Sequence, residues 1–256
     1  MELNSRKAFI PRKKPPLRRV RPAVSKIIFL SLEGCVTEEE YFRDIVMEYF
    51  SNVKSKIQFV SVQEDVLKIP QKWRTQEQES SLGRSLPDQL VEKIDVFKQE
   101  QNDRFEFDKF PDDEFWVVMD VDDHWSDEKI SHWNTAVAQC REKGYSYAVS
   151  NPFFELWLLL HHDDVTTDEE KYAVTSNHSY EKTSHFKERL AKLGAPIRRN
   201  KHLDVRHYSK EKIIHAVSRA IGLHKDRSDL SPKYLATTVY LLLEEIIDLD
   251  KNVENL

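Results

Sequence analysis

Residues 115–123 read Phe-Trp-Val-Val-Met-Asp-Val-Asp-Asp, and this stretch decides the fold. Its first five residues form a short continuous apolar run, which is typical of a strand buried on both faces of a parallel sheet. Three acidic residues follow at once, namely Asp120, Asp122 and Asp123. A buried strand that runs straight into carboxylates predicts an α/β protein whose functional residues lie at the carboxyl ends of the strands.

Strands and helices alternate on both sides of this stretch. Short apolar runs predict further strands at 26–32, 56–62 and 145–150. Helical spacing of apolar residues predicts helices at 37–49, 87–101, 127–143 and 153–161. Thr37 is expected to cap the first of these helices, with Glu40 reaching back to complete a capping box. The alternation predicts a Rossmann-like, mostly parallel sheet flanked by helices.

The pattern changes after about residue 165. Helices are predicted near 180–193, 210–224 and 233–250, with no convincing strand between them. We therefore expect an α/β core over 25–164 and a helical C-terminal extension over 165–256, packed on that core. Residues near 63–85 are rich in Gln, Ser and charge, and are interpreted as an insertion into the core.

The N-terminal residues 1–24 form a basic arm. Residues 1–22 carry eight Lys or Arg and one acid, a net charge of about +7, whereas the whole chain has a net charge of −5. One interpretation is a disordered, solubilising tail. The other is an arm that binds phosphates by releasing counterions, through Arg12, Lys13, Lys14, Arg18 and Arg19.

Composition excludes several classes of protein. The two cysteines, Cys35 and Cys140, can form neither a disulfide framework nor a CxxC zinc site. No apolar run approaches the roughly 20 residues of a transmembrane helix, and the basic N-terminus lacks the apolar core of a secretory signal. These features predict a cytoplasmic protein.

Acidic side chains follow two of the predicted strands. Glu33 comes directly after the strand at 26–32, and Asp120 and Asp122 are spaced so that both point the same way. Converging carboxylates require a neutralising cation, and hard oxygen ligands suit Mg²⁺ or Mn²⁺. The alternatives are an ordinary turn at Glu33-Gly34 and a solvated acidic loop at 120–123.

Three further residues are ambiguous. Glu155 lies within the apolar helix at 153–161, so it is either the partner of an Arg or Lys or a member of the acidic site. His124 follows the acids and is either a phosphate contact or a loop histidine. The pair His161-His162 suggests a helix-terminus role rather than a metal site, because adjacent side chains at a helix end point apart.

Three motifs together resemble the RloB-like family. They are Glu33-Gly34 with Thr37-Glu38 and Tyr41-Phe42, the segment 120–123, and Ser150-Asn151-Pro152 followed by Phe154-Glu155, Trp157 and Leu159-Leu160-His161. The resemblance implies a Toprim-like domain in which Glu33 is a general acid or base and Asp120 and Asp122 hold Mg²⁺. It further implies a nuclease effector of bacterial anti-phage defence whose partner is an ABC-type ATPase of the RloA kind. The chain has no GxxxxGK[ST] loop of its own for ATP hydrolysis.

Other functions remain open on the sequence alone. A non-catalytic subunit could keep the same fold to bind the ATPase or a nucleic acid, with its acidic residues serving only the structure. A haloacid-dehalogenase-type phosphatase needs its DxD after the first strand, and a DxD glycosyltransferase needs a nucleotide-sugar pocket for which the sequence shows no signal. The sequence decides neither between DNA and RNA as substrate nor whether the chain forms a homo-oligomer.

Overall fold

A five-stranded sheet forms the centre of the molecule. The computed structural model describes residues 26–34, 36–60, 85–121, 130–166, 179–198 and 201–254. The strands are β1 (Ile28–Leu32), β2 (Ile57–Phe59), β3 (Glu114–Asp120), β4 (Ser146–Asn151) and β5 (Ala236–Thr237), in the spatial order β2-β1-β3-β4-β5. The first four are parallel and β5 is antiparallel to β4. The predicted α/β fold with a mostly parallel sheet is thus confirmed.

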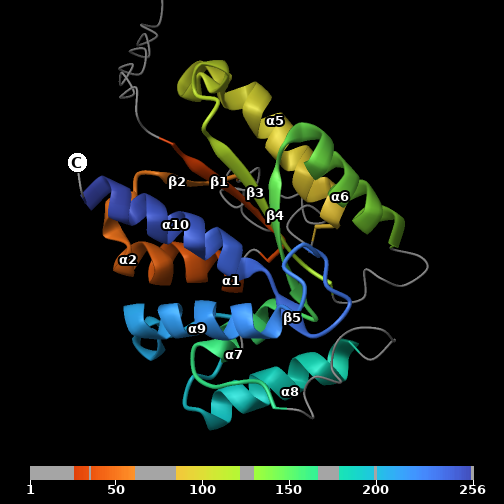
Figure 1. Cartoon of the computed structure of the whole chain (residues 1–256), viewed down its shortest axis with the longest axis vertical. Helices are drawn as coiled ribbons and strands as arrows, with labels where there is room; N and C mark the ends of the chain where they lie inside the picture. The colour runs from red at the N-terminus through yellow and green to blue at the C-terminus, as the bar shows by residue number, and fades with distance from the viewer. Residues whose placement is uncertain are drawn as a thin grey trace, which may run out of the picture.

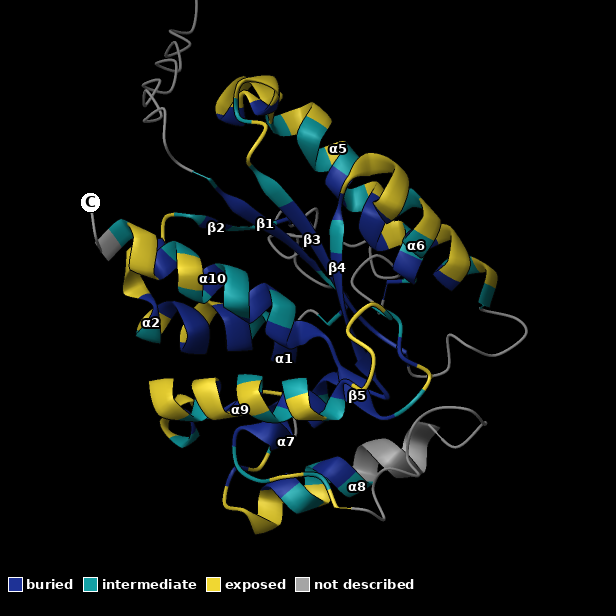
Figure 2. Ribbon diagram, viewed as in Figure 1, coloured by how far each residue is buried: buried dark blue, intermediate teal, exposed yellow. Residues whose placement is uncertain are grey.

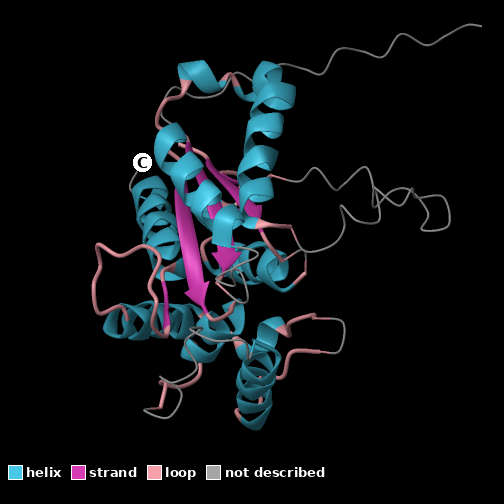
Figure 3. Cartoon of the chain, turned by 90° about the vertical axis from the view of Figure 1, so that its right-hand side faces the viewer, coloured by secondary structure: helices cyan, strands magenta, loops and turns pink. Residues whose placement is uncertain are grey.

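Helices cover both faces of the sheet (Figures 1 and 3). One face carries α5 (Pro87–Phe105), the short turn η4 (Phe107–Lys109) and α6 (Ile130–Lys143). On the side of the other face lie α1 (Thr37–Glu40), the π-helical turn η1 (Tyr41–Val46), α2 (Met47–Tyr49), η2 (Ser51–Val53), α7 (Phe154–Leu160), α8 (Ser179–Lys192), η6 (Val205–His207), α9 (Lys210–Leu223) and α10 (Val239–Glu254). Of these, α8 packs against α7, and α9 packs against α7 and α10.

Strand alternation explains this two-sided burial. Phe29 and Val117 point to the face covered by α5 and α6, whereas Leu30 and Val118 point to the other face. The strands are buried over most of their length (Figure 2). Runs without polar alternation are what a parallel sheet covered on both faces requires.

The expectation of helices alone after residue 165 was wrong, because β5 adds a strand to the sheet. Its two residues pair with Ser150 and Asn151 of β4. The side chain of Thr238 extends the contact by accepting a 2.8 Å hydrogen bond from the Val149 amide. A strand of two residues is too short to produce a periodic pattern, so only the tertiary structure reveals it.

The last third of the chain also contributes to the main core. Tyr240 and Leu243 of α10 and Ala216 of α9 belong to the same buried cluster as Leu30 and Trp116 of the sheet. The arm at 1–24 and nearly all of the predicted insertion near 63–85 lie outside the described residues. No helix in the described part is both long and apolar enough to cross a bilayer.

Candidate acidic site at the carboxyl end of the sheet

The strand order places a topological switch point at the carboxyl ends of β1 and β3. The chain passes from β1 outward to β2, then returns over the sheet to β3 on the other side of β1. The helices after β1 cover one face and α5, after β2, covers the opposite face. In open α/β sheets, ligands bind at such a switch point, outside the carboxyl ends of the two diverging strands.

Glu33 and Asp120 meet at this switch point. The backbone amide of Glu33 donates a 3.0 Å hydrogen bond to the Val118 carbonyl, which continues the pairing of β1 with β3. The Glu33 carboxylate then accepts a 2.9 Å hydrogen bond from the backbone amide of Asp120. Both side chains are largely buried. Two of the three predicted site residues are therefore joined by a hydrogen bond from the backbone of one to the side chain of the other.

Glu38 brings a further carboxylate that the sequence interpretation did not include among the site residues. It lies on α1 and is buried, with its carboxylate packed directly over Gly34. Burial, with the negative charges of Glu155 and Glu33, raises the pKa of Glu38 to about 7. Its own backbone amide and Lys201 act in the opposite direction. The signal that could have identified it was the Thr37-Glu38 pair of the first motif.

Glu155 both pairs with a basic side chain and lies near the other acids, the two alternatives that the sequence left open. Its carboxylate lies 3.3 Å from the Lys187 ammonium of α8, so it has a basic partner. It also lies close enough to Glu38 to raise the pKa of that residue. α7 thus contributes an acid to the cluster that we call the acidic site, which consists of Glu33, Glu38, Asp120 and Glu155.

The capping box predicted for α1 was wrong, and its residues make long-range contacts instead. Thr37 donates a 2.9 Å hydrogen bond to the carbonyl oxygen of Lys201. Glu40 accepts a 2.8 Å bond from the Leu203 amide and also binds His202. The segment 201–203 therefore fixes the helix that carries Glu38.

His161 follows α7, the helix that carries Glu155, but belongs to a different network. Its Nδ1 bonds to the Trp157 carbonyl at 2.9 Å while its Nε2 bonds to the Tyr41 hydroxyl at 2.9 Å. Burial lowers the pKa of His161 to about 3, so the ring is neutral. A neutral ring that donates from Nδ1 must accept from the Tyr41 hydroxyl. The helix-terminus arrangement expected for His161 is present.

Several predicted residues lie outside the described part of the chain. They are Asp122, Asp123, His124 and the arm residues Arg12, Lys13, Lys14, Arg18 and Arg19. Within the described residues, no three His, Cys, Asp or Glu side chains are arranged so that they could hold a metal ion. The donor chemistry nevertheless suits Mg²⁺ or Mn²⁺, since buried carboxylate oxygens with unfavourable mutual repulsion are hard ligands in need of positive charge.

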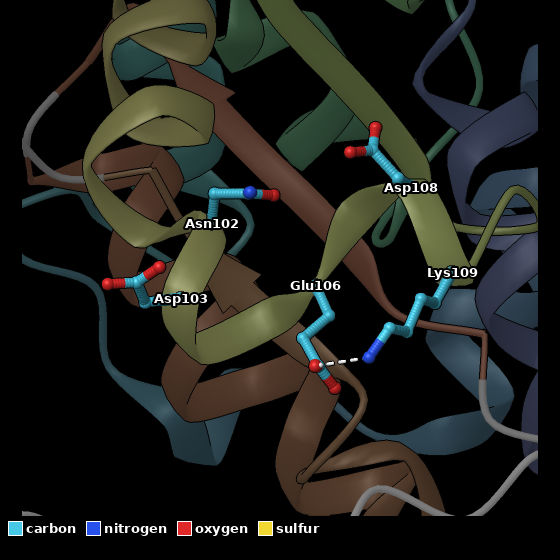
Figure 4. A pocket seen from close by; sticks show the side chains of 5 residues that line it. All are labelled: Asn102, Asp103, Glu106, Asp108 and Lys109. Carbon is cyan, nitrogen blue, oxygen red and sulfur yellow. Dashed lines mark hydrogen bonds and ion pairs between the residues drawn. The ribbon is translucent and has the colours of Figure 1, made fainter.

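A polar hollow lies in the segment before the amino end of β3 (Figure 4). It is lined by Asn102, Asp103, Glu106, Asp108 and Lys109, and Glu106 pairs with Lys109 at 2.6 Å. The side chains of Asp103 and Asp108 point in different directions, and both residues are exposed. This hollow is a solvated surface feature and is not combined with the acidic site.

Comparison with known families agrees with the sequence motifs. The family model for RloB-like protein matches residues 28–246, which is most of the chain. The chain belongs to the RloB-like family. No curated protein and no solved structure matches it. Membership in the RloB-like family therefore stands on the family model and on the motifs, all three of which have residues in or beside the acidic site.

Proposed function

We propose that this RloB-like chain is a metal-dependent nuclease of the Toprim kind, acting as an effector of bacterial anti-phage defence. The observation that carries the proposal is the meeting of Glu33 and Asp120 at the switch point, joined by a 2.9 Å hydrogen bond. Acidic residues at the ends of two adjacent parallel strands occupy the position where α/β enzymes bind their ligands. The family resemblance assigns catalysis and metal binding to the same two residues.

The arrangement supports a division of roles among the carboxylates. Asp120, with Asp122 two residues later, would hold Mg²⁺ or Mn²⁺, and Glu33 would share the ion or move a proton. A bound divalent cation stabilises charge on a phosphodiester and lowers the pKa of water. Glu38 lies near both Glu33 and Glu155, and these charges would add to the negative potential that attracts a cation.

The substrate class and the partner extend this proposal. The substrate would be the phosphodiester backbone of DNA or RNA. An ABC-type ATPase of the RloA kind would supply ATP hydrolysis, since this sequence contains no phosphate-binding GxxxxGK[ST] loop.

The test is cleavage of plasmid DNA, single-stranded DNA and total tRNA with Mg²⁺ or Mn²⁺, alone and with the ATPase. We expect Glu33→Gln and Asp120→Asn to lose about 100-fold or more in rate, the size that follows from removing charge stabilisation in a transition state. Asp248→Asn is the matched control, because Asp248 is exposed on α10 and pairs with Lys251. Cleavage that persists in both site variants would contradict the proposal.

A second candidate is a non-catalytic subunit that binds the ATPase or a nucleic acid. It is favoured by the structural contacts of the acids, since Glu33 bonds to backbone and Glu155 pairs with Lys187. Titration calorimetry with Mn²⁺ separates the two candidates. The nuclease requires binding that Asp120→Asn abolishes, whereas the binding subunit shows no carboxylate-dependent affinity for the ion.

A further inference from the structure

A basic hollow is lined by residues of η1, β2 and α5 and by Lys54. Among the described strands, β2 is the last of the sheet on that side (Figure 1). We call this hollow the edge groove. It lies between the two helical layers, because Arg43 comes from η1 on one face and Arg104 comes from α5 on the other. Its main lining residues are Arg43, Lys54, Phe59, Phe97, Gln101 and Arg104.

The edge groove is positively charged although the chain as a whole is acidic. It is lined by three cations, with no Asp or Glu among the lining residues, in a chain of net charge −5. Arg43 shares its charge with Glu39, 2.5 Å away. In the part of the chain that the structure describes, neither Lys54 nor Arg104 forms a salt bridge. Such a concentration of charge favours an anionic ligand.

Aromatic rings lie among these cations. The Arg43 guanidinium lies 4.5 Å from the centre of the Phe59 ring, and Phe97 contributes a second ring from α5. Both rings are only partly buried. Cations that bind phosphates, interleaved with rings on which bases stack, are the chemistry by which proteins hold single-stranded nucleic acid.

The edge groove also lies close to the acidic site. Phe59 of β2 is paired in register with Leu30 of β1. Glu33 follows Leu30 by three residues, a distance of about 10 Å along a strand, and β1 is one strand spacing of about 5 Å from β2. A strand bound in the edge groove would therefore reach the acidic site within a few nucleotides.

We propose that the edge groove binds the backbone and bases of single-stranded nucleic acid and leads it toward the acidic site. This inference rests on the proposed nuclease function and names the form of its substrate. Arg43, Lys54 and Arg104 bind phosphates, and Phe59 provides a stacking surface.

The experiment is fluorescence anisotropy of the full chain with labelled oligothymidylate and oligouridylate, in EDTA so that no cutting occurs. The triple variant Arg43→Gln, Lys54→Gln, Arg104→Gln should bind at least about tenfold more weakly. Its salt slope should fall by about 2, since each phosphate contact to a single strand contributes roughly 0.7. The matched control is Lys192→Gln, Arg227→Gln, Lys233→Gln, which removes three exposed charges elsewhere and should change affinity less than twofold.

Phe59→Leu tests stacking separately from charge. It should weaken binding about fivefold or more without changing the salt slope, because base stacking is independent of counterion release. Equal losses in the two triple variants, or no loss in the first, would overturn the proposal. A different outcome is that polyglutamate displaces the oligonucleotide as well as unlabelled oligonucleotide does, and loses this ability in the triple variant. That result would overturn the proposal and identify the ligand as an acidic peptide. Failure of the nuclease is recognised independently, as absent metal-dependent cleavage with binding intact.

Discussion

Two polar clusters lie along the same pair of helical segments, and they differ in charge. One is neutral and fully hydrogen-bonded, and the other brings carboxylates close together. Tyr41, His161 and the Trp157 carbonyl form one cluster, in which both ring nitrogens of His161 have hydrogen-bond partners and burial keeps the ring neutral. Glu38 and Glu155 form the other, next to Glu33, and there like charges are packed together. The hydrogen bonds of the first cluster stabilise the fold. The buried negative charges of the second cluster lower the stability of the fold.

That difference separates a structural cluster from a candidate functional one. A fully satisfied buried network rigidifies a fold. A buried carboxylate whose pKa is raised by burial and by neighbouring negative charges destabilises the fold unless a cation or a proton compensates it, and such groups concentrate at functional sites. The predictions below test whether the two clusters differ in this way.

The largest effect on stability is expected at His161. His161→Phe leaves the Tyr41 hydroxyl buried without its acceptor, so we expect the free energy of unfolding at pH 7.5 to fall by about 2–4 kcal/mol. Chemical denaturation measures this loss. His215→Gln, at an exposed position of α9, is the control and should change stability little.

The same substitution should alter the pH dependence of stability. The folded-state pKa of His161, about 3, lies below its ordinary value of 6.5, so the unfolded chain binds more protons between these values. Wild-type stability therefore falls as pH is lowered from 6.5 toward 3, by up to about 1.4 kcal/mol for each pH unit crossed. His161→Phe lacks this contribution, and an unchanged pH profile would contradict the assignment.

An intermediate effect of opposite sign is expected at Glu38. Its folded-state pKa, about 7, lies above the ordinary 4.5, so the folded chain loses stability as pH rises through this window. Glu38→Gln should stabilise the protein by about 1–3 kcal/mol at pH 8 in EDTA and by much less near pH 5. Glu48→Gln, exposed on α2, is the control. If Glu38→Gln instead destabilised the protein at pH 8, the Glu38 carboxylate would be a stabilising group, like the cluster of Tyr41 and His161.

The smallest effect on stability is expected at Gly34. A Cβ there would overlap the Glu38 carboxylate, which is the movable end of a side chain. Gly34→Ala should cost less than about 1 kcal/mol while displacing Glu38. Because the two residues touch, Glu38→Gln should stabilise Gly34→Ala less than it stabilises the wild type, a non-additivity that a double-mutant cycle measures. Strict additivity would show that the contact has no energetic consequence.

The sequence predicted the parts of the site that depend on strand ends. Glu33 and Asp120 were found because apolar runs locate the strands, and the carboxyl ends of parallel strands meet at one edge. Glu38 was missed because the side chain reaches the site from a helix, over a glycine, which no periodicity reveals. The capping box failed for a related reason, since the partners of Thr37 and Glu40 lie more than 160 residues away along the chain.

Those distant contacts have a consequence for biosynthesis. The helix that carries Glu38 is held by residues 201–203, so the acidic site cannot take its final form on a nascent chain until that segment has left the ribosome. The sheet also waits for β5 and α10, near the end of translation. The amino-terminal residues of the site are therefore made first but organised late, and premature termination before residue 201 would release a chain that lacks the contacts holding the helix of Glu38.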